Sequence, residues 1–246
     1  MRAVLRVAVC MKQVLDPEAP ASTLVIDELS LAVSAPGTPP LWNPNDLNAL
    51  KAANDLGDAE ITVITAGPSP SKNLILKALA HGASRAVIVE APTSYDSGFT
   101  AQILADALLE AGEFDLILTG RRAPDTNAGA VGFMLAQRLG LPVIALATAI
   151  KVVDGGRCVE VDRLIDGGIE TTTSPLPTVV TVSNEVGELP YTEFKAIAAA
   201  KKKPIETIVA SPEAPDLAVK LVAMEKPVFE RTCQMIDAAE LAELLA

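Results

Sequence analysis

A chain of 246 residues in which half are hydrophobic but only 3% are aromatic can bury one large core of Ala, Val, Leu and Ile, which excludes a disordered or disulfide-stapled protein. The net charge of −11 disfavours nucleic acid as a partner, because phosphate backbones would repel it. Three dispersed cysteines and a single histidine, His81, indicate a reducing compartment without a structural metal, and because no apolar run approaches a membrane span we expect a cytoplasmic protein that is not membrane-embedded.

The chain alternates apolar strands with helices that have one apolar face. We expect one helix to start at Asn43 and three more to span residues 71–80, 98–110 and 127–139. We expect strands at residues 4–10, 61–65, 86–90, 114–120, 143–150 and 176–182. Such β-α repeats in series predict an α/β fold with a doubly wound, mostly parallel sheet. Residues 12–41 contain five prolines and no helical period, and so long an excursion in a compact domain is usually functional.

The pattern changes at Lys151 and again after Ser183. Residues 151–173 alternate around Gly-rich turns, which predicts a small antiparallel meander within an α/β domain of residues 1–183. Residues 184–203 are a polar, aperiodic stretch followed by an Ala/Lys-rich helix or coil. We expect residues 204–246 to form an extended C-terminal arm that ends in a short amphipathic helix at 237–246, and its small apolar content predicts that it lies on an oligomer or partner subunit.

The strand, loop and helix of residues 114–139 stand at the centre of the predicted domain. The strand ends at Gly120, a polar loop with Arg121 and Arg122 follows, and the helix from Asn127 would begin with free backbone amides. At the carboxyl end of a parallel strand this arrangement favours an anion such as a phosphate. The alternative is an ordinary strand-to-helix connection with a solvated arginine pair.

Motifs for catalysis are missing from the sequence. There is no Gly-x-Gly-x-x-Gly, no P-loop and no Ser-Gly-Gly-x-Asp pyrophosphate loop, which disfavours usual dinucleotide binding and ATP hydrolysis. His81 precedes Gly82 at a predicted helix end and has no Gly-x-Ser-x-Gly elbow to serve, so we interpret it as a C-terminal helix residue. We therefore expect neither nucleophilic catalysis through His81 nor ATP hydrolysis on this chain.

Several short motifs stand in order at near-gapless spacing. They are 12–16 (Lys-Gln-Val-Leu-Asp), Asn43-Pro44, Ala66-Gly67-Pro68, 78–86 (Ala-Leu-Ala-His-Gly-Ala-Ser-Arg-Ala), 120–123 with Asp125 and Gly132, 166–171, 176–181 and 201–204. Together they resemble the beta (small) subunit of electron-transfer flavoproteins, whose corresponding motifs include Lys-Arg-Val-Ile-Asp, Asn-Pro-Phe and Ala-Leu-Ala-Met-Gly-Ala-Asp-Arg-Ala. The resemblance covers nearly the whole chain to about Pro204.

The resemblance implies an electron carrier that is not itself an enzyme and has no catalytic residue, with a fold of the adenine-nucleotide-binding type. In this family an alpha subunit holds most of a redox FAD, while the chain that this one resembles binds a structural AMP. The heterodimer would accept electrons from flavin-dependent dehydrogenases and pass them to a downstream quinone-linked or iron-sulfur oxidoreductase. The nucleotide contacts that the resemblance implies are Cys10, Asn43, Pro44, Asn45, Asp46, Ala66, Gly120, Arg121, Arg122, Ala123, Pro124, Asp125, Thr126, Asn127, Ala128, Gly129, Ala130 and Val131.

The chain departs from the family pattern at three places. Residues 129–132 read Gly-Ala-Val-Gly where the family usually has Asn-Gln-Thr before the glycine, so backbone amides and Arg121 or Arg122 would have to bind the phosphate. Pro17 and Asn45 replace aromatic residues that lie near the flavin in relatives, which implies a different environment for the alpha-bound flavin.

The family also presents a recognition loop to its dehydrogenases, and residues 190–195 fall at that position. Tyr191 and Phe194 would bind the partner, with Phe194 in the place of an exposed Leu. The alternative is that Phe194 packs on its own domain. Two other functions stay open: an electron-bifurcating subunit with a second FAD in this chain, or a nucleotide-binding sensor without redox chemistry.

Overall fold

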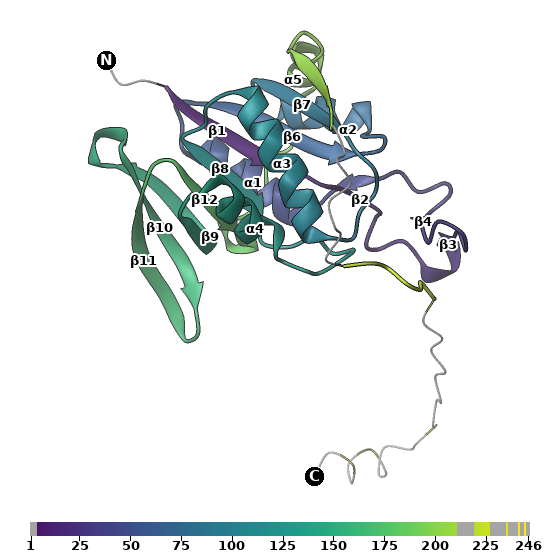
Figure 1. The fold of residues 1–246 in the computed structure, drawn as a ribbon. Helices are drawn as coiled ribbons and strands as arrows, with labels where there is room; N and C mark the ends of the chain where they lie inside the picture. The colour runs from purple at the N-terminus through teal and green to yellow at the C-terminus, as the bar shows by residue number, and fades with distance from the viewer. Residues whose placement is uncertain (1–3, 211–218, 227–234, 236–240, 242–243, 245–246) are drawn as a thin grey trace.

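The computed structural model describes residues 4–210 and 219–226, and beyond them only residues 235, 241 and 244. Within this part of the chain, nine strands form one sheet in the order β11-β10-β9-β12-β8-β1-β6-β7-β13 (Figure 1). Its parallel strands are β1 (Leu5–Cys10), β6 (Ala59–Gly67), β7 (Arg85–Glu90), β8 (Leu116–Gly120), β9 (Val143–Val153), β12 (Thr178–Val182) and β13 (Ile205–Val209).

Four helices of the described chain cover the two faces of this sheet. α1 (Pro44–Asp55) and α2 (Lys72–Ala80) pack on one face, whereas α3 (Ser97–Ala111) and α4 (Val131–Leu139) pack on the other (Figure 1). Side chains of β1 alternate between the two cores, with Val7 and Val9 in the first and Ala8 in the second. The predicted doubly wound α/β fold is therefore confirmed. None of the helices within the described ranges has the length and apolar character needed to cross a membrane.

An antiparallel hairpin extends one edge of the sheet, as the sequence predicted for residues 151–173. β9 runs on beyond its pairing with β12, a short 3-10 helix η2 (Asp154–Gly156) reverses the chain, and β10 (Cys158–Ile165) and β11 (Gly168–Pro175) follow. These strands project from the body of the domain (Figure 1).

Residues between β1 and α1 form two short antiparallel pairs. β2 (Gln13–Val14) pairs with β5 (Leu41–Trp42), and β3 (Val25–Ile26) pairs with β4 (Val33–Ser34) after the 3-10 helix η1 (Ala21–Thr23). The buried Trp42 side chain donates a hydrogen bond from Nε1 to the Leu74 carbonyl at 2.8 Å. This bond fixes the returning end of the excursion to α2, just before α1 begins.

The helix of the central unit begins later than the sequence predicted. We expected it to start at Asn127, but α4 starts at Val131. Asn127 and Gly129 have φ angles of 53° and 62°, in the left-handed region that a helix interior excludes. The prediction of the helix start was therefore wrong, and the loop after Gly120 is longer by four residues.

We expected the chain to leave the sheet after Ser183, but a later strand, β13, rejoins it. Residues 184–203 contain the 3-10 helix η3 (Asn184–Val186) and then α5 (Phe194–Ala200), which packs against α2. β13 then pairs in parallel with β7, so residues 205–209 belong to the α/β domain and not to an arm. The pairing protects the edge of β7, and β-branched residues suit such a strand. The amphipathic helix expected at 237–246 lies mostly outside the described residues.

Candidate functional site

The strand order reverses beside β1, which has β6 on one side and β8 on the other. In open α/β sheets this switch point leaves a crevice at the carboxyl ends of the strands, where ligands bind. Cys10 at the end of β1 is level with Ile64 of β6 and Thr119 of β8. The sheet therefore brings the predicted residues Cys10, Ala66 and Gly120 to neighbouring strand ends.

A buried carboxylate from α1 joins two of these strand ends. Asn43 caps α1 by accepting a hydrogen bond from the Asn45 N–H at 3.2 Å, and Asp46 follows in the first turn. Asp46 Oδ2 accepts the Lys12 N–H at 2.7 Å, and Oδ1 accepts the Gly120 N–H at 2.9 Å. We call this pair of bonds the Asp46 clamp, since one side chain holds the chain leaving β1 and the end of β8.

Gly120 is required by this close approach. A Cβ at this position would lie 2.5 Å from Asp46 Oδ1 and 2.7 Å from Asn45 Cβ, distances that real Cβ contacts do not show. The glycine that ends the predicted strand thus allows α1 to touch the backbone of β8.

Burial controls the ionisation of the two acidic groups at the switch point. Loss of solvent raises the pKa of Asp46 to about 7, although the hydrogen bonds from Lys12 and Gly120 act in the opposite direction. Burial, together with the nearby charge of Asp46, raises the pKa of the Cys10 thiol to about 12. Cys10 is therefore a neutral thiol at pH 7 and unsuited to nucleophilic chemistry.

The loop after Gly120 folds back over the start of α1. The Arg122 carbonyl accepts hydrogen bonds from Nδ2 of both Asn43 and Asn45, each at 2.9 Å. Lys12 Nζ forms an ion pair with Asp125 at 2.7 Å. These contacts bring residues 43–46 and the loop together, as the predicted site requires.

The start of α4 lies against the ends of β8 and β12. A Cβ on the buried Gly132 would be 2.7 Å from Thr181 Cγ2 and 2.8 Å from Thr119 Oγ1. The Met134 N–H donates to the carbonyl of the N-cap residue Ala130 at 3.0 Å, so the amides before Met134 belong to the first turn, which has no intrahelical acceptors for them. Thr119 Oγ1 is buried and has no hydrogen-bond partner among the described residues. Amides and a spare hydroxyl at this place are groups that suit a phosphate.

The predicted nucleotide-binding residues differ in how deeply they are buried. Cys10, Asn43 and Asp46 are buried, and Gly120 and Arg121 are half-buried beside them. Exposed residues of the predicted set are Pro44, Arg122, Pro124, Asp125, Asn127 and Ala128. The remaining ones, which are half-buried, are Asn45, Ala66, Ala123, Thr126, Gly129, Ala130 and Val131. The exposed arginine, Arg122, thus enters the site through its carbonyl oxygen.

Lys12 and Thr119 belong to this region but were missing from the predicted set. The Lys12 ion pair joins residues 113 positions apart, which no local pattern reveals. Thr119 did leave a signal, because it is a polar residue inside the apolar run that forms β8.

The two side chains predicted to bind a partner are exposed to solvent. Tyr191 is 97% exposed and Phe194, the first residue of α5, is 86% exposed. Phe194 does not pack on its own domain, so that alternative is excluded. Large exposed aromatic side chains on a polar segment favour contact with another protein.

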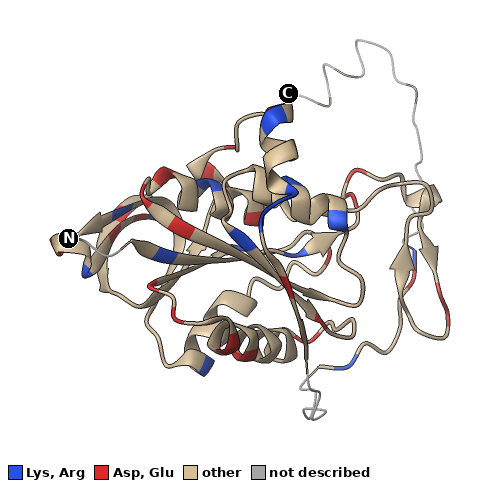
Figure 2. Cartoon of the chain, turned by 90° about the horizontal axis from the view of Figure 1, so that it is seen from above, with Lys and Arg blue, Asp and Glu red and all other residues tan. Residues whose placement is uncertain are grey.

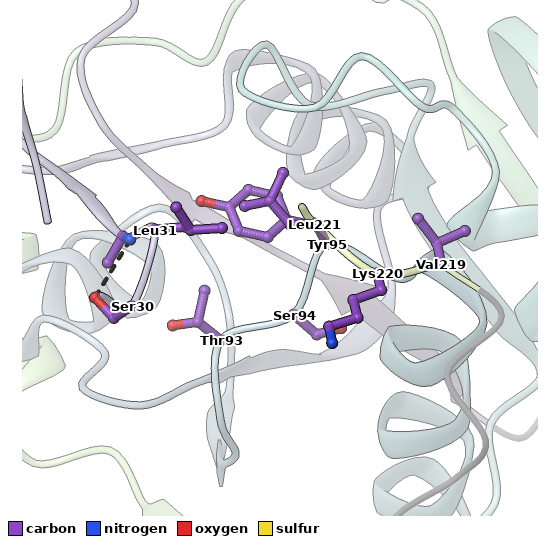
Figure 3. A pocket seen from close by; sticks show the side chains of 9 residues that line it. Ser30, Leu31, Thr93, Ser94, Tyr95, Val219, Lys220 and Leu221 are labelled. Carbon is purple, nitrogen blue, oxygen red and sulfur yellow. Dashed lines mark hydrogen bonds between the residues drawn. The ribbon is translucent and has the colours of Figure 1, made fainter. Parts of the chain in front are cut away.

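A separate pocket of about 380 Å³ lies at the loop after β7 (Figure 3). It is lined by Ser30, Leu31, Ala32, Thr93, Ser94, Tyr95, Val219, Lys220 and Leu221. The Val219 N–H donates to Asp96 Oδ2 at 2.9 Å, which holds the C-terminal segment at the start of α3. None of the predicted nucleotide contacts lines this pocket.

Acidic and basic residues alternate along the chain and occur on the same elements, without a large region of one sign (Figure 2). Of the cations, Lys12, Arg121 and Arg122 come from the strand ends and loop at the switch point. Because Lys12 is paired with Asp125, the two arginines provide the local positive charge in a chain whose net charge is −11.

Comparison with known proteins gives one consistent result. Residues 37–213 match the electron transfer flavoprotein domain. The chain is 33% identical over 227 residues to electron transfer flavoprotein subunit beta of Syntrophomonas wolfei, covering 91% of this chain and 86% of the relative. It is 33% identical over 221 residues to the caffeyl-CoA reductase-Etf complex subunit CarD of Acetobacterium woodii, covering 85% and 82%. Identity to electron transfer flavoprotein subunit beta of Bos taurus is 36% over 174 residues, covering 68% and 67%.

Proposed function

Because the chain belongs to the electron transfer flavoprotein family as a beta-type subunit, we propose that it forms a heterodimer with an alpha subunit that holds a redox FAD. We propose further that this chain binds a structural AMP at the switch point. The observation that supports the site most strongly is the Asp46 clamp, which organises the strand ends where ligands bind in such sheets.

The residues of this chain would bind and shield the nucleotide. Amides at the start of α4 and the Thr119 hydroxyl face the phosphate, and Arg121 adds positive charge. Asp46 keeps the ends of β1 and β8 in place, and the neutral Cys10 thiol adds no charge of its own. The FAD of the alpha subunit, when bound, supplies the redox chemistry. This chain contributes no catalytic residue.

Two protein contacts complete the proposal. Tyr191 and Phe194 bind a flavin-dependent dehydrogenase, because their exposure leaves both side chains available to a partner pocket. The described residues 219–226, most of which remain exposed, contact the alpha subunit. Electrons then pass to a downstream quinone-linked or iron-sulfur oxidoreductase in the cytoplasm.

The cofactor content of the purified heterodimer tests this function. The chain is co-expressed with its alpha subunit, the complex is denatured by heat, and released flavin and adenylate are measured by absorbance and mass. We expect one FAD and one AMP per heterodimer. Two FAD and no AMP would overturn the AMP assignment in favour of a bifurcating subunit. A colourless protein without an alpha partner would instead support a nucleotide-binding sensor.

A further inference from the structure

The C-terminal end of α2 is a meeting point for three distant segments. The helix ends at Ala80, and His81 is its C-cap. Asn54 Nδ2 donates to the His81 carbonyl at 2.6 Å. Lys203 Nζ donates to the carbonyls of Leu79 and Ala83 at 2.8 and 2.6 Å. Carbonyls that a helix end leaves unpaired are thus satisfied by side chains from α1 and from the segment after α5.

The ring of His81 makes the third contact, to the segment that precedes α5. Thr192 Oγ1 lies 2.7 Å from His81 Nε2 and 3.1 Å from Nδ1, so Nε2 is the better partner. Burial and the nearby Lys77 lower the pKa of His81, which keeps the ring neutral at pH 7. A neutral ring has one N–H and one lone pair, and the Thr192 hydroxyl can complement either.

Thr192, which makes this contact, lies in the sequence between two exposed aromatic residues. Thr192 is half-buried, whereas Tyr191 on one side is 97% exposed and Phe194 on the other is 86% exposed. Thr192 is therefore held inward while its neighbours project outward. Because Lys203 fixes the other end of α5 to the same helix end, the segment 192–203 is attached at both of its limits.

We propose that His81 is a positioning residue, which through Thr192 holds Tyr191 and Phe194 in the arrangement that the dehydrogenase binds. This inference rests on the proposed function, since that function supplies the partner. A segment that is already ordered loses less conformational entropy on binding, so the contact strengthens association without touching the partner.

A matched pair of variants isolates the hydroxyl. Thr192→Val removes it at nearly constant volume, whereas Thr192→Ser retains it. Hydrogen–deuterium exchange of residues 187–197 is followed by mass spectrometry in the complex with the alpha subunit. We expect exchange to accelerate about fivefold in Thr192→Val and in His81→Phe, the effect of losing one neutral hydrogen bond, and to stay unchanged in Thr192→Ser.

Electron transfer from the dehydrogenase supplies the second measurement. Thr192→Val should raise the KM for the flavoprotein about fivefold with kcat unchanged, and Thr192→Ser should restore the original KM. Unchanged exchange in Thr192→Val would overturn the positioning role. The positioning role would also be overturned if Phe194→Ala raises the KM but Thr192→Val, despite its faster exchange, does not. If neither variant changes the KM, the proposed partner surface itself is wrong.

Discussion

Asp46 Oδ1 accepts a hydrogen bond from the Gly120 N–H at 2.9 Å, so the first turn of α1 is bonded directly to the end of β8. The bond joins residues 74 positions apart and depends on the absence of a side chain at position 120. Under the proposed function, this bond links AMP binding to the stability of the sheet, because the same strand ends serve both.

Replacing Gly120 by Ala should damage both properties. The new Cβ would lie 2.6 Å from the Asn45 carbonyl carbon, which as a backbone atom cannot move without shifting α1. We expect a loss of about 1–3 kcal/mol in the free energy of unfolding, measured by chemical denaturation, together with loss of bound AMP. Gly168→Ala is the control, since a Cβ there meets no atom within 4 Å. Equal stability of the two variants would contradict the close approach.

Asp46 should also make stability depend on pH. Its pKa rises from 3.8 to about 7 in the folded protein, so between these values the folded state holds a proton that the unfolded chain has released. The stability that this carboxyl contributes is fully present below pH 3.8 and is lost as pH rises through about 7. Its maximum slope is about 1.4 kcal/mol per pH unit. Asp46→Asn should flatten the measured slope between about pH 5 and pH 7, even though the variant is less stable at each pH. Parallel slopes for the two proteins would show that this carboxyl does not titrate there.

The Thr119 hydroxyl offers a test that separates ligand binding from folding. It is buried and lacks a partner among the residues that the structure describes, so Thr119→Val should leave the melting temperature of nucleotide-free protein unchanged or higher. The rise in melting temperature on adding AMP should shrink, because the ligand loses one hydrogen bond. Thr62→Val is the contrasting control, since Thr62 Oγ1 accepts a bond from Arg85 Nε at 3.1 Å and its loss should destabilise the free protein. An undiminished response to AMP would remove Thr119 from the site.

Phe194 should matter for partner binding and not for folding. Removing a buried interface aromatic costs about 2 kcal/mol, roughly a thirtyfold loss of affinity. We therefore expect Phe194→Ala to weaken electron transfer from the dehydrogenase while the melting temperature and flavin content stay unchanged. Leu29→Ala is the control, because Leu29 is 98% exposed on a different segment. A fall in melting temperature with normal electron transfer would exclude the docking role.

The sequence was sufficient to predict the layers of the fold but not all of its boundaries. Hydrophobic periodicity identifies strands such as β8, whose residues 116–119 are all buried. β13 gives no such pattern, because Ile205, Glu206, Thr207 and Val209 are exposed on an edge strand whose partner is distant in the chain. The start of α4 was misplaced because Asn127 suits a helix cap chemically, whereas its left-handed φ follows from the path of the loop.

The candidate site, like the fold, could be predicted from the sequence only in part. The family motifs predicted which residues occur near the switch point, and the strand register brings Cys10 and Gly120 to neighbouring strand ends. The Asp46 clamp and the ion pair of Lys12 with Asp125 join segments 34 to 113 positions apart. Such contacts follow from the packing of α1 against the sheet, which sequence patterns do not specify.

β13 also determines when the domain can finish folding during synthesis. It is the last strand of the described sheet in chain order, yet it pairs with β7, which is made much earlier. A nascent chain that has not yet released residue 209 from the ribosome carries β7 as an open edge, exposed to pairing with strands of other chains. Release of β13 closes that edge, so the nascent domain becomes protected only after residue 209 has left the ribosome.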